Sequence, residues 1–364
     1  MLEVAIGIAI IAMVLSDIFQ AVIVPRYSPA SLRFAPFLIG KVAWALCRKT
    51  AAFINSEVVL DLYLGMFAPF TMIVMLLGSL LAMIFAFALI IHGLGTEFKP
   101  VVGDFGTALY LSATSLLTIG FGDIIAVHLP GRVTVLAAGV VGITLVAIGV
   151  SFLFSMQQAV HFRETVVHTL QGRIQPANSA VSLLLNYADL GLEEDLGNQI
   201  KDWELWLASV LTSHRSYPLL CYFRSGHMCV SWITVIGIML DTCNLLSSTV
   251  NDKRYSHAEF FLQIGKRLVR FMETYFELSP ANSSVSREEF HSAYILLKGR
   301  GYPLKEEESA WEKFHLTRSE YAPALTALAF AFITQPPGWL PVQDANLTSP
   351  GSAESELYLE SLPS

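Results

Sequence analysis

The chain has 364 residues, of which 54% are hydrophobic and only 15% are charged, and its mean hydropathy is +0.54. This composition excludes a protein that is soluble along its whole length, and the net charge of −7 argues against nucleic acid as a partner. The apolar residues concentrate in the first 160 positions. Three stretches there are long enough to cross a hydrocarbon core of about 30 Å, namely 2–24, 66–92 and 132–156.

Residues 2–24 form the first predicted membrane helix. The stretch has no basic start and ends at Pro25 and Arg26 instead of a small-residue cleavage site. We therefore expect a retained helix and not a signal peptide. Asp17 lies in its second half, where a charge is costly and usually faces protein or water. Two interpretations stay open for Asp17: a regulatory residue, or a residue with a partner near the membrane interface.

Residues 25–60 are predicted to form a basic interfacial helix and a linker. The basic residues alternate with apolar ones, which is typical of an amphipathic helix on a membrane surface. They are Arg26, Arg33, Lys41, Arg48 and Lys49. Basic loops mark the cytoplasmic side, so we expect the N-terminus outside and the C-terminal domain in the cytoplasm. We expect the protein to lie in the cell membrane, where these basic residues would contact anionic lipids. The alternative is a fourth span over about 35–60, which would bury several of these charges.

Residues 61–160 contain the segment of greatest functional interest. An outer helix over 66–92 and an inner helix over 131–156 flank a short helix over 104–117 and the run Thr-Ile-Gly-Phe-Gly-Asp at 118–123. A cation that crosses a membrane exchanges its hydration shell for fixed oxygens, and rings of backbone carbonyls can supply them. Successive carbonyls point at one axis only if the backbone alternates in handedness, which Gly120 and Gly122 permit. Thr118 can add its hydroxyl at the inner end, while the side chains of Ile119 and Phe121 point away.

This run resembles the signature filter of the potassium channel pore-domain superfamily. Residues 108–112, the pair 131–132 and the triplet 142–144 are similar to the pore helix, the inner-helix start and the hinge region of two-transmembrane bacterial potassium channels. The resemblance covers about 66–156. It implies a homotetramer, because one pore loop supplies a quarter of a filter. It also implies K⁺ bound as permeant ion at Thr118, Ile119, Gly120 and Phe121, with Gly122 completing the filter, and no organic cofactor.

Further roles follow from the same resemblance. It implies a hinge at Gly142, a cavity lined by Ile143, Val146 and Val150, and an inner constriction near Phe154.

The sequence also departs from the simplest bacterial pores around Asp123. Thr114 replaces a glutamate and Leu111 replaces a tryptophan, both of which support the filter aspartate in those channels. Phe121 lacks the phenol hydroxyl that often stabilises the filter from behind. We expect Tyr110 or Thr114 to substitute, and we expect inactivation at this filter to differ from that of the simplest pores.

Residues 161–334 are predicted to form a cytoplasmic helical domain for regulation or assembly, followed by a disordered tail over 335–364. The apolar stretch 229–246 is interpreted as a buried core helix, with a re-entrant or fourth spanning helix as the alternative. We find no signature of a nucleotide-binding, EF-hand or cyclic-nucleotide module. Arg215 and Arg224 lie in a polar and aromatic stretch that either binds an anion or forms a helix corner or subunit contact. His161 and His168 are candidates for pH sensing.

Together these features predict an all-α membrane protein that conducts K⁺ passively and is gated through its cytoplasmic domain. No nucleophile–base pair or metal-ligand set indicates an enzyme. Two alternatives stay open: a weakly selective cation channel on the same scaffold, and a membrane receptor or scaffold with a vestigial pore.

Overall fold

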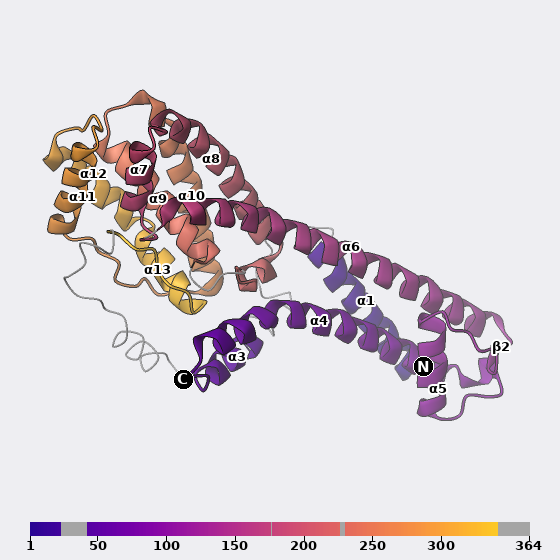
Figure 1. The fold of residues 1–364 in the computed structure, drawn as a ribbon. Coiled ribbons are helices and arrows are strands. Elements are labelled where there is room, and N and C mark those ends of the chain that lie inside the picture. Colours follow the sequence, from indigo (N-terminus) through magenta and orange to yellow (C-terminus); the bar gives the residue numbers. More distant parts are fainter. Residues whose placement is uncertain (23–41, 176, 226–229, 341–364) are drawn as a thin grey trace. The chain divides into compact units, whose positions relative to one another are not determined.

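The computed structural model describes residues 1–22, 42–175, 177–225 and 230–340 (Figure 1). It divides the chain into two compact units. The first unit contains 1–161 together with 213–224, and the second contains 162–212 and the residues from 225 onward. The sequence predicts one domain boundary, near residue 160. The structure shows in addition that 213–224 belongs to the first unit.

Three long apolar helices dominate the first unit. They are α1 (Leu2–Val22), α4 (Glu57–Gly93) and α6 (Leu129–Ile174), and each is long and apolar enough to cross a membrane. The helical membrane architecture predicted from the sequence is therefore confirmed. Helix α4 begins at Glu57, before the predicted start at residue 66, and α6 continues beyond residue 161 into the second unit.

The basic segment is described from residue 42 onward. There it forms α3 (Trp44–Ala51), which carries Arg48 and Lys49 in its last turn. A break at 52–56 separates α3 from α4, so the described part of the chain has no continuous span over 42–60. Arg26, Arg33 and Lys41 lie outside the described residues.

The connection from α4 to α6 contains the shortest elements. It passes through η3 (Gly95–Glu97), β1 (Phe98–Lys99), α5 (Phe105–Leu116) and β2 (Ile125–Ala126). The two strands pair antiparallel, with Phe98 opposite Ala126. Ala108 and Leu111 of α5 are buried in one apolar cluster with Ala88 and Ile91 of α4. This packing fixes α5 against α4, and the loop 117–124 follows from its C-terminal end (Figure 1).

The first helix packs on the same scaffold. Gly7 of α1 lies so close to α4 that a Cβ there would be 2.5 Å from the carbonyl oxygen of Ala86. At the start of α1, the Glu3 carboxylate lies 2.7 Å from His92 Nδ1 near the end of α4. Both contacts hold the first two turns of α1 against the last part of α4.

The second unit is a bundle of helices around one buried helix (Figure 1). Its helices are α7 (Ala180–Asp189), α8 (Glu193–Ser216), α9 (Trp232–Thr249), η5 (Lys253–Tyr255), α10 (His257–Phe276), α11 (Arg287–Gly299), α12 (Glu307–Ser319) and α13 (Ala322–Ala331). Serine residues 179, 231 and 286 accept hydrogen bonds from the first turns of α7, α9 and α11, which sets where these helices begin.

The stretch interpreted as a core helix is α9. It is buried on all sides, which is how a helix that is apolar around its whole circumference behaves in a soluble core. After α8 ends at Ser216, the short helix η4 (Pro218–Tyr222) follows.

The first residues of the predicted disordered tail, 335–340, are ordered. The Trp339 ring packs 5.0 Å from the ring of Phe314, and Gly338 forms a β-bridge with Ser179. These contacts give 335–340 a defined place on the second unit. The remainder, 341–364, lies outside the described residues.

Candidate functional site

The site is built on α5, whose start is fixed by a side-chain cap. The Asp104 carboxylate accepts hydrogen bonds from the Thr107 amide at 2.9 Å and from the Thr107 hydroxyl at 2.6 Å. These bonds hold the pKa of Asp104 below its ordinary value. In its middle, α5 is tied to α4 by the buried Ser112 hydroxyl, which donates to the Ile84 carbonyl at 2.7 Å. The helix therefore presents its C-terminal end in a fixed position.

The backbone after α5 has the alternation that a carbonyl filter requires. Thr118, Gly120 and Gly122 have φ values of 57°, 57° and 78°, so every second residue is left-handed. The amides of Ile119 and Gly120 both donate to the Thr114 carbonyl, at 2.8 and 3.3 Å. The start of the loop is thus hydrogen-bonded to the end of α5. The left-handed Thr118 is unusual for a residue with a branched Cβ and was not predicted from the sequence.

Tyr110 contacts the far end of this loop, at Phe121 and Asp123. Its hydroxyl donates to Asp123 Oδ2 at 2.9 Å, and its ring stacks parallel to Phe121 at 6.3 Å between centroids. The Thr114 hydroxyl instead donates to carbonyls within α5. Leu111 is buried in the cluster that joins α5 to α4. Of the two substitutes that the sequence suggested for Asp123, the structure therefore places Tyr110 in contact with it.

The loop is open on its other side in a single chain. Ile119 and Phe121 are 51% and 68% exposed, and Thr118, Gly120 and Gly122 are exposed as well. A backbone that is held on one side and bare on the other is incomplete as an ion-binding site. The loop supplies the groups on one side of such a site, and a complete site requires further groups on the exposed side.

Gly142 lies at the closest approach of α6 to α5. A Cβ at this position would be 1.8 Å from the Leu116 carbonyl oxygen and 2.8 Å from its carbonyl carbon. Both atoms belong to backbone, so neither can move aside as a side chain could. Helix α6 runs through Gly142 without a break. The structure thus gives the predicted hinge residue a second property, which is the close packing of α6 against the end of α5.

The predicted cavity and constriction residues share one face of α6. They follow a helical repeat and are exposed in the single chain, at 63% for Ile143, 58% for Val146, 46% for Val150 and 69% for Phe154. Such an apolar stripe on a membrane helix faces lipid, another helix or a pore.

The candidate regulatory residues are dispersed over both units. Asp17 is half-buried on α1, and His161 and His168 are exposed on α6. Arg215 is exposed near the end of α8, whereas Arg224 forms an ion pair with Asp61 of α4 at 2.9 Å. Among the described residues, no group of His, Cys, Asp and Glu is arranged to hold a metal ion.

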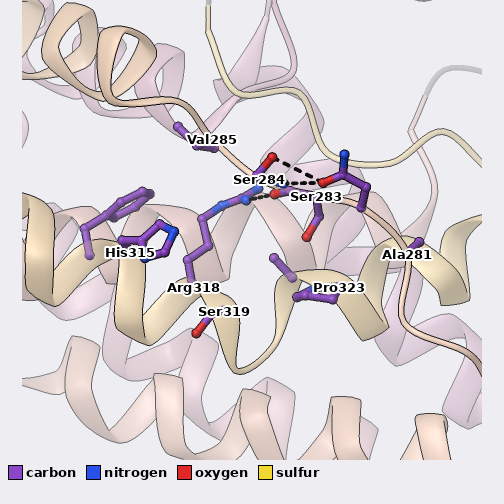
Figure 2. A pocket seen from close by; sticks show the side chains of 11 residues that line it. Ala281, Ser283, Ser284, Val285, His315, Arg318, Ser319 and Pro323 are labelled. Atoms are coloured by element: carbon purple, nitrogen blue, oxygen red, sulfur yellow. Dashed lines mark hydrogen bonds between the residues drawn. The ribbon is translucent and has the colours of Figure 1, made fainter.

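A separate pocket of about 180 Å³ lies in the second unit, where the loop before α11 meets α12 and α13 (Figure 2). Arg318 lines it, but its guanidinium donates to the Ser283 carbonyl and, at 3.1 Å, to Asp241 Oδ1. The Tyr321 hydroxyl donates to the same carboxylate oxygen at 2.6 Å. Because the charge of Arg318 is compensated within the fold, these groups stabilise the contact of α9 with α12.

Comparison with known proteins addresses the first unit. A family model described as "Ion channel" matches residues 79–159, from the middle of α4 through α5 and the loop 117–124 into α6. This match confirms the predicted pore-domain superfamily for that part of the chain, which is not an enzyme class. Comparison with curated proteins and with solved structures gives no match.

Proposed function

Because residues 79–159 are an ion-channel pore domain in a membrane protein, we propose that the chain forms a K⁺-selective channel. The observation that carries this proposal is the left-handed backbone at Thr118, Gly120 and Gly122. Alternating handedness turns successive carbonyl oxygens toward the same side, where they replace the hydration shell of a dehydrated cation. The ions would bind as cargo between the carbonyls of Thr118, Ile119, Gly120 and Phe121, with no organic cofactor.

The working unit of this proposal is a homotetramer. The loop is held by α5 on one side and exposed on the other, so a ring of four copies would complete the filter. In that arrangement the stripe of Ile143, Val146, Val150 and Phe154 lines the aqueous cavity below the filter. The C-terminal ends of four α5 helices would then add negative potential at its centre.

The proposed orientation places the N-terminus outside and the second unit in the cytoplasm of the cell. Three spanning helices would put the two ends of the described chain on opposite sides, and Arg48 and Lys49 of α3 support taking the α3 side as the inner one. These two residues, with Arg26, Arg33 and Lys41, would contact anionic lipids of the inner leaflet. Gating would come from the second unit, because α6 continues as one helix from the pore domain into it.

Purified full-length protein in liposomes tests the proposal. We expect the liposomes to pass K⁺ and not Na⁺. Native mass spectrometry should show a tetramer. Equal K⁺ and Na⁺ fluxes would support a weakly selective cation channel instead, which the loss of the phenol hydroxyl at Phe121 makes physically reasonable. Absence of any flux in a tetramer would contradict conduction and favour a receptor or scaffold.

A further inference from the structure

Residues 213–224, which we call the strap, leave the second half of the chain and join the pore unit. They comprise the last residues of α8, η4 and the two residues that follow. The residues before and after the strap belong to the second unit, whereas the strap itself belongs to the first unit together with 1–161. The strap therefore connects the cytoplasmic part of the chain to the membrane helices by a route other than α6.

The centre of the strap fills the space between α4 and α6. Leu220 is fully buried in one apolar cluster with Met72 of α4 and Met156 of α6. Beside it, the Tyr217 ring packs edge-on against Phe152 of α6, with 5.8 Å between centroids. The strap thus separates the cytoplasmic ends of the outer and inner helices of the pore.

Two further contacts fix the end of the strap to α3 and α4. The Tyr222 ring lies 5.1 Å from Trp44 of α3 and 5.4 Å from Phe67 of α4, and the latter two rings are 4.9 Å apart. Arg224 Nε donates to Asp61 Oδ1 of α4 at 2.9 Å, with the two side chains 19% and 26% exposed. A partly buried ion pair and three mutually packed rings hold the strap in one register.

The strap lies behind the face of α6 that carries Phe154. Positions 152 and 156 lie one turn apart on the same face of a helix, whereas 154 lies on the opposite face. This agrees with burial, since Met156 is completely buried under the strap and Phe154 is 69% exposed.

We propose that the strap opposes opening of the pore. This inference rests on the proposed function in one respect, which is that Phe154 faces the pore axis. Widening a four-fold pore then moves each α6 away from the axis and toward α4. Leu220 occupies that space between Met72 and Met156, so α6 can move only if the strap is displaced. A partner or signal that displaces the strap would open the channel.

A charge-swap cycle on the full-length protein in planar bilayers tests the proposal. Arg224→Glu places two carboxylates together, and we expect the open probability to rise about two- to fivefold, as the loss of a partly exposed ion pair allows. Adding Asp61→Arg restores the opposite charges and should return the open probability toward that of the wild type. The matched control is Arg300→Glu, which breaks an ion pair of 2.5 Å with Asp189 inside the second unit. It should leave gating unchanged.

A second variant removes the apolar contact. Leu220→Ala should raise the open probability more than Arg224→Glu does, because it empties the space behind α6. Leu205→Ala, at a leucine that is 69% exposed on α8, is the control. A readout independent of conduction is hydrogen–deuterium exchange over 150–160, which should accelerate in the strap variants and not in the controls.

Each outcome decides a different claim. Unchanged or lower open probability and unchanged exchange in tetrameric strap variants would overturn the inference while leaving the channel function intact. Absence of K⁺ flux from the wild type would overturn the proposed function. Faster exchange without conduction would still support the strap as the element that holds α6.

Discussion

The two units of the chain differ in how much of their apolar helix surface is buried. In the second unit, α9 is buried on all sides, so one chain completes its core. In the first unit, only 6%, 33% and 28% of the residues in the most apolar stretches of α1, α4 and α6 are buried. This low burial is what the proposed tetramer requires, in which lipid and other copies of the chain cover the apolar faces of the pore unit.

Polar groups follow the same contrast. The second unit buries the Asp241 carboxylate, which Arg318 and Tyr321 satisfy by direct hydrogen bonds. The pore unit leaves the Thr-Ile-Gly-Phe-Gly backbone exposed and holds it from one side only. A buried pair stabilises a fold, while an exposed set of carbonyls can bind an ion. Substitutions in each unit separate these two roles of polar groups.

The largest effect is expected at Gly122. Its φ of 78° costs an alanine about 1–2 kcal/mol in each copy, and relaxing this strain would rotate a carbonyl out of line. Gly122→Ala should abolish K⁺ flux in liposomes without preventing tetramer formation. Gly78→Ala is the matched control, because it lies in α4 with open space around its Cβ position. Retained selective flux in Gly122→Ala would contradict the assignment of the filter.

Breaking the buried pair should damage only the second unit. Asp241→Ala leaves Arg318 without its carboxylate, and such losses destabilise by about 3–5 kcal/mol. Limited proteolysis should then cleave within 230–340 and leave a fragment of the first 160 residues intact. The control is the exposed ion pair of Asp189 with Arg300, since Asp189→Ala should leave the proteolysis pattern unchanged. Proteolysis of both units together would show that they do not fold separately.

Gly142 tests how α6 meets α5. A Cβ there would overlap the Leu116 carbonyl, and overpacking of this kind costs about 1–3 kcal/mol. Gly142→Ala should lower the thermal stability of the tetramer and its K⁺ flux together. On the same helix, Gly172→Ala meets open space and should be neutral or slightly stabilising. A variant that changes gating alone, with unchanged stability, would favour a pure hinge role for Gly142.

The smallest effect is expected at Tyr110. Tyr110→Phe keeps the ring stacked on Phe121 but removes the hydrogen bond to Asp123. Inactivation in sustained recordings should become faster by about two- to fivefold, because the loss of one exposed hydrogen bond is a modest change. Tyr294→Phe, which loses a comparable bond to the Lys305 carbonyl in the second unit, is the control. Identical time courses for the wild type and Tyr110→Phe would mean that Asp123 does not support the filter.

The parts of the molecule that were predictable from the sequence are those with a local residue pattern. The three apolar helices follow from long apolar runs, and the loop proposed as the filter was located from two glycines beside a threonine and an aspartate. The left-handed Thr118 was not predictable, because its conformation is set by hydrogen bonds to the end of α5. Nor was the strap, since Arg224 and Asp61 are separated by 163 positions and only the fold brings them together.

The central claim is that the loop 118–122 forms a filter selective for K⁺. The most direct measurement is the reversal potential of the purified wild-type protein in a planar bilayer, with K⁺ on one side and Na⁺ on the other. The proposed filter predicts a reversal potential displaced strongly toward the K⁺ equilibrium potential, and no K⁺ current in Gly122→Ala. A reversal potential near zero in the wild type would contradict the claim.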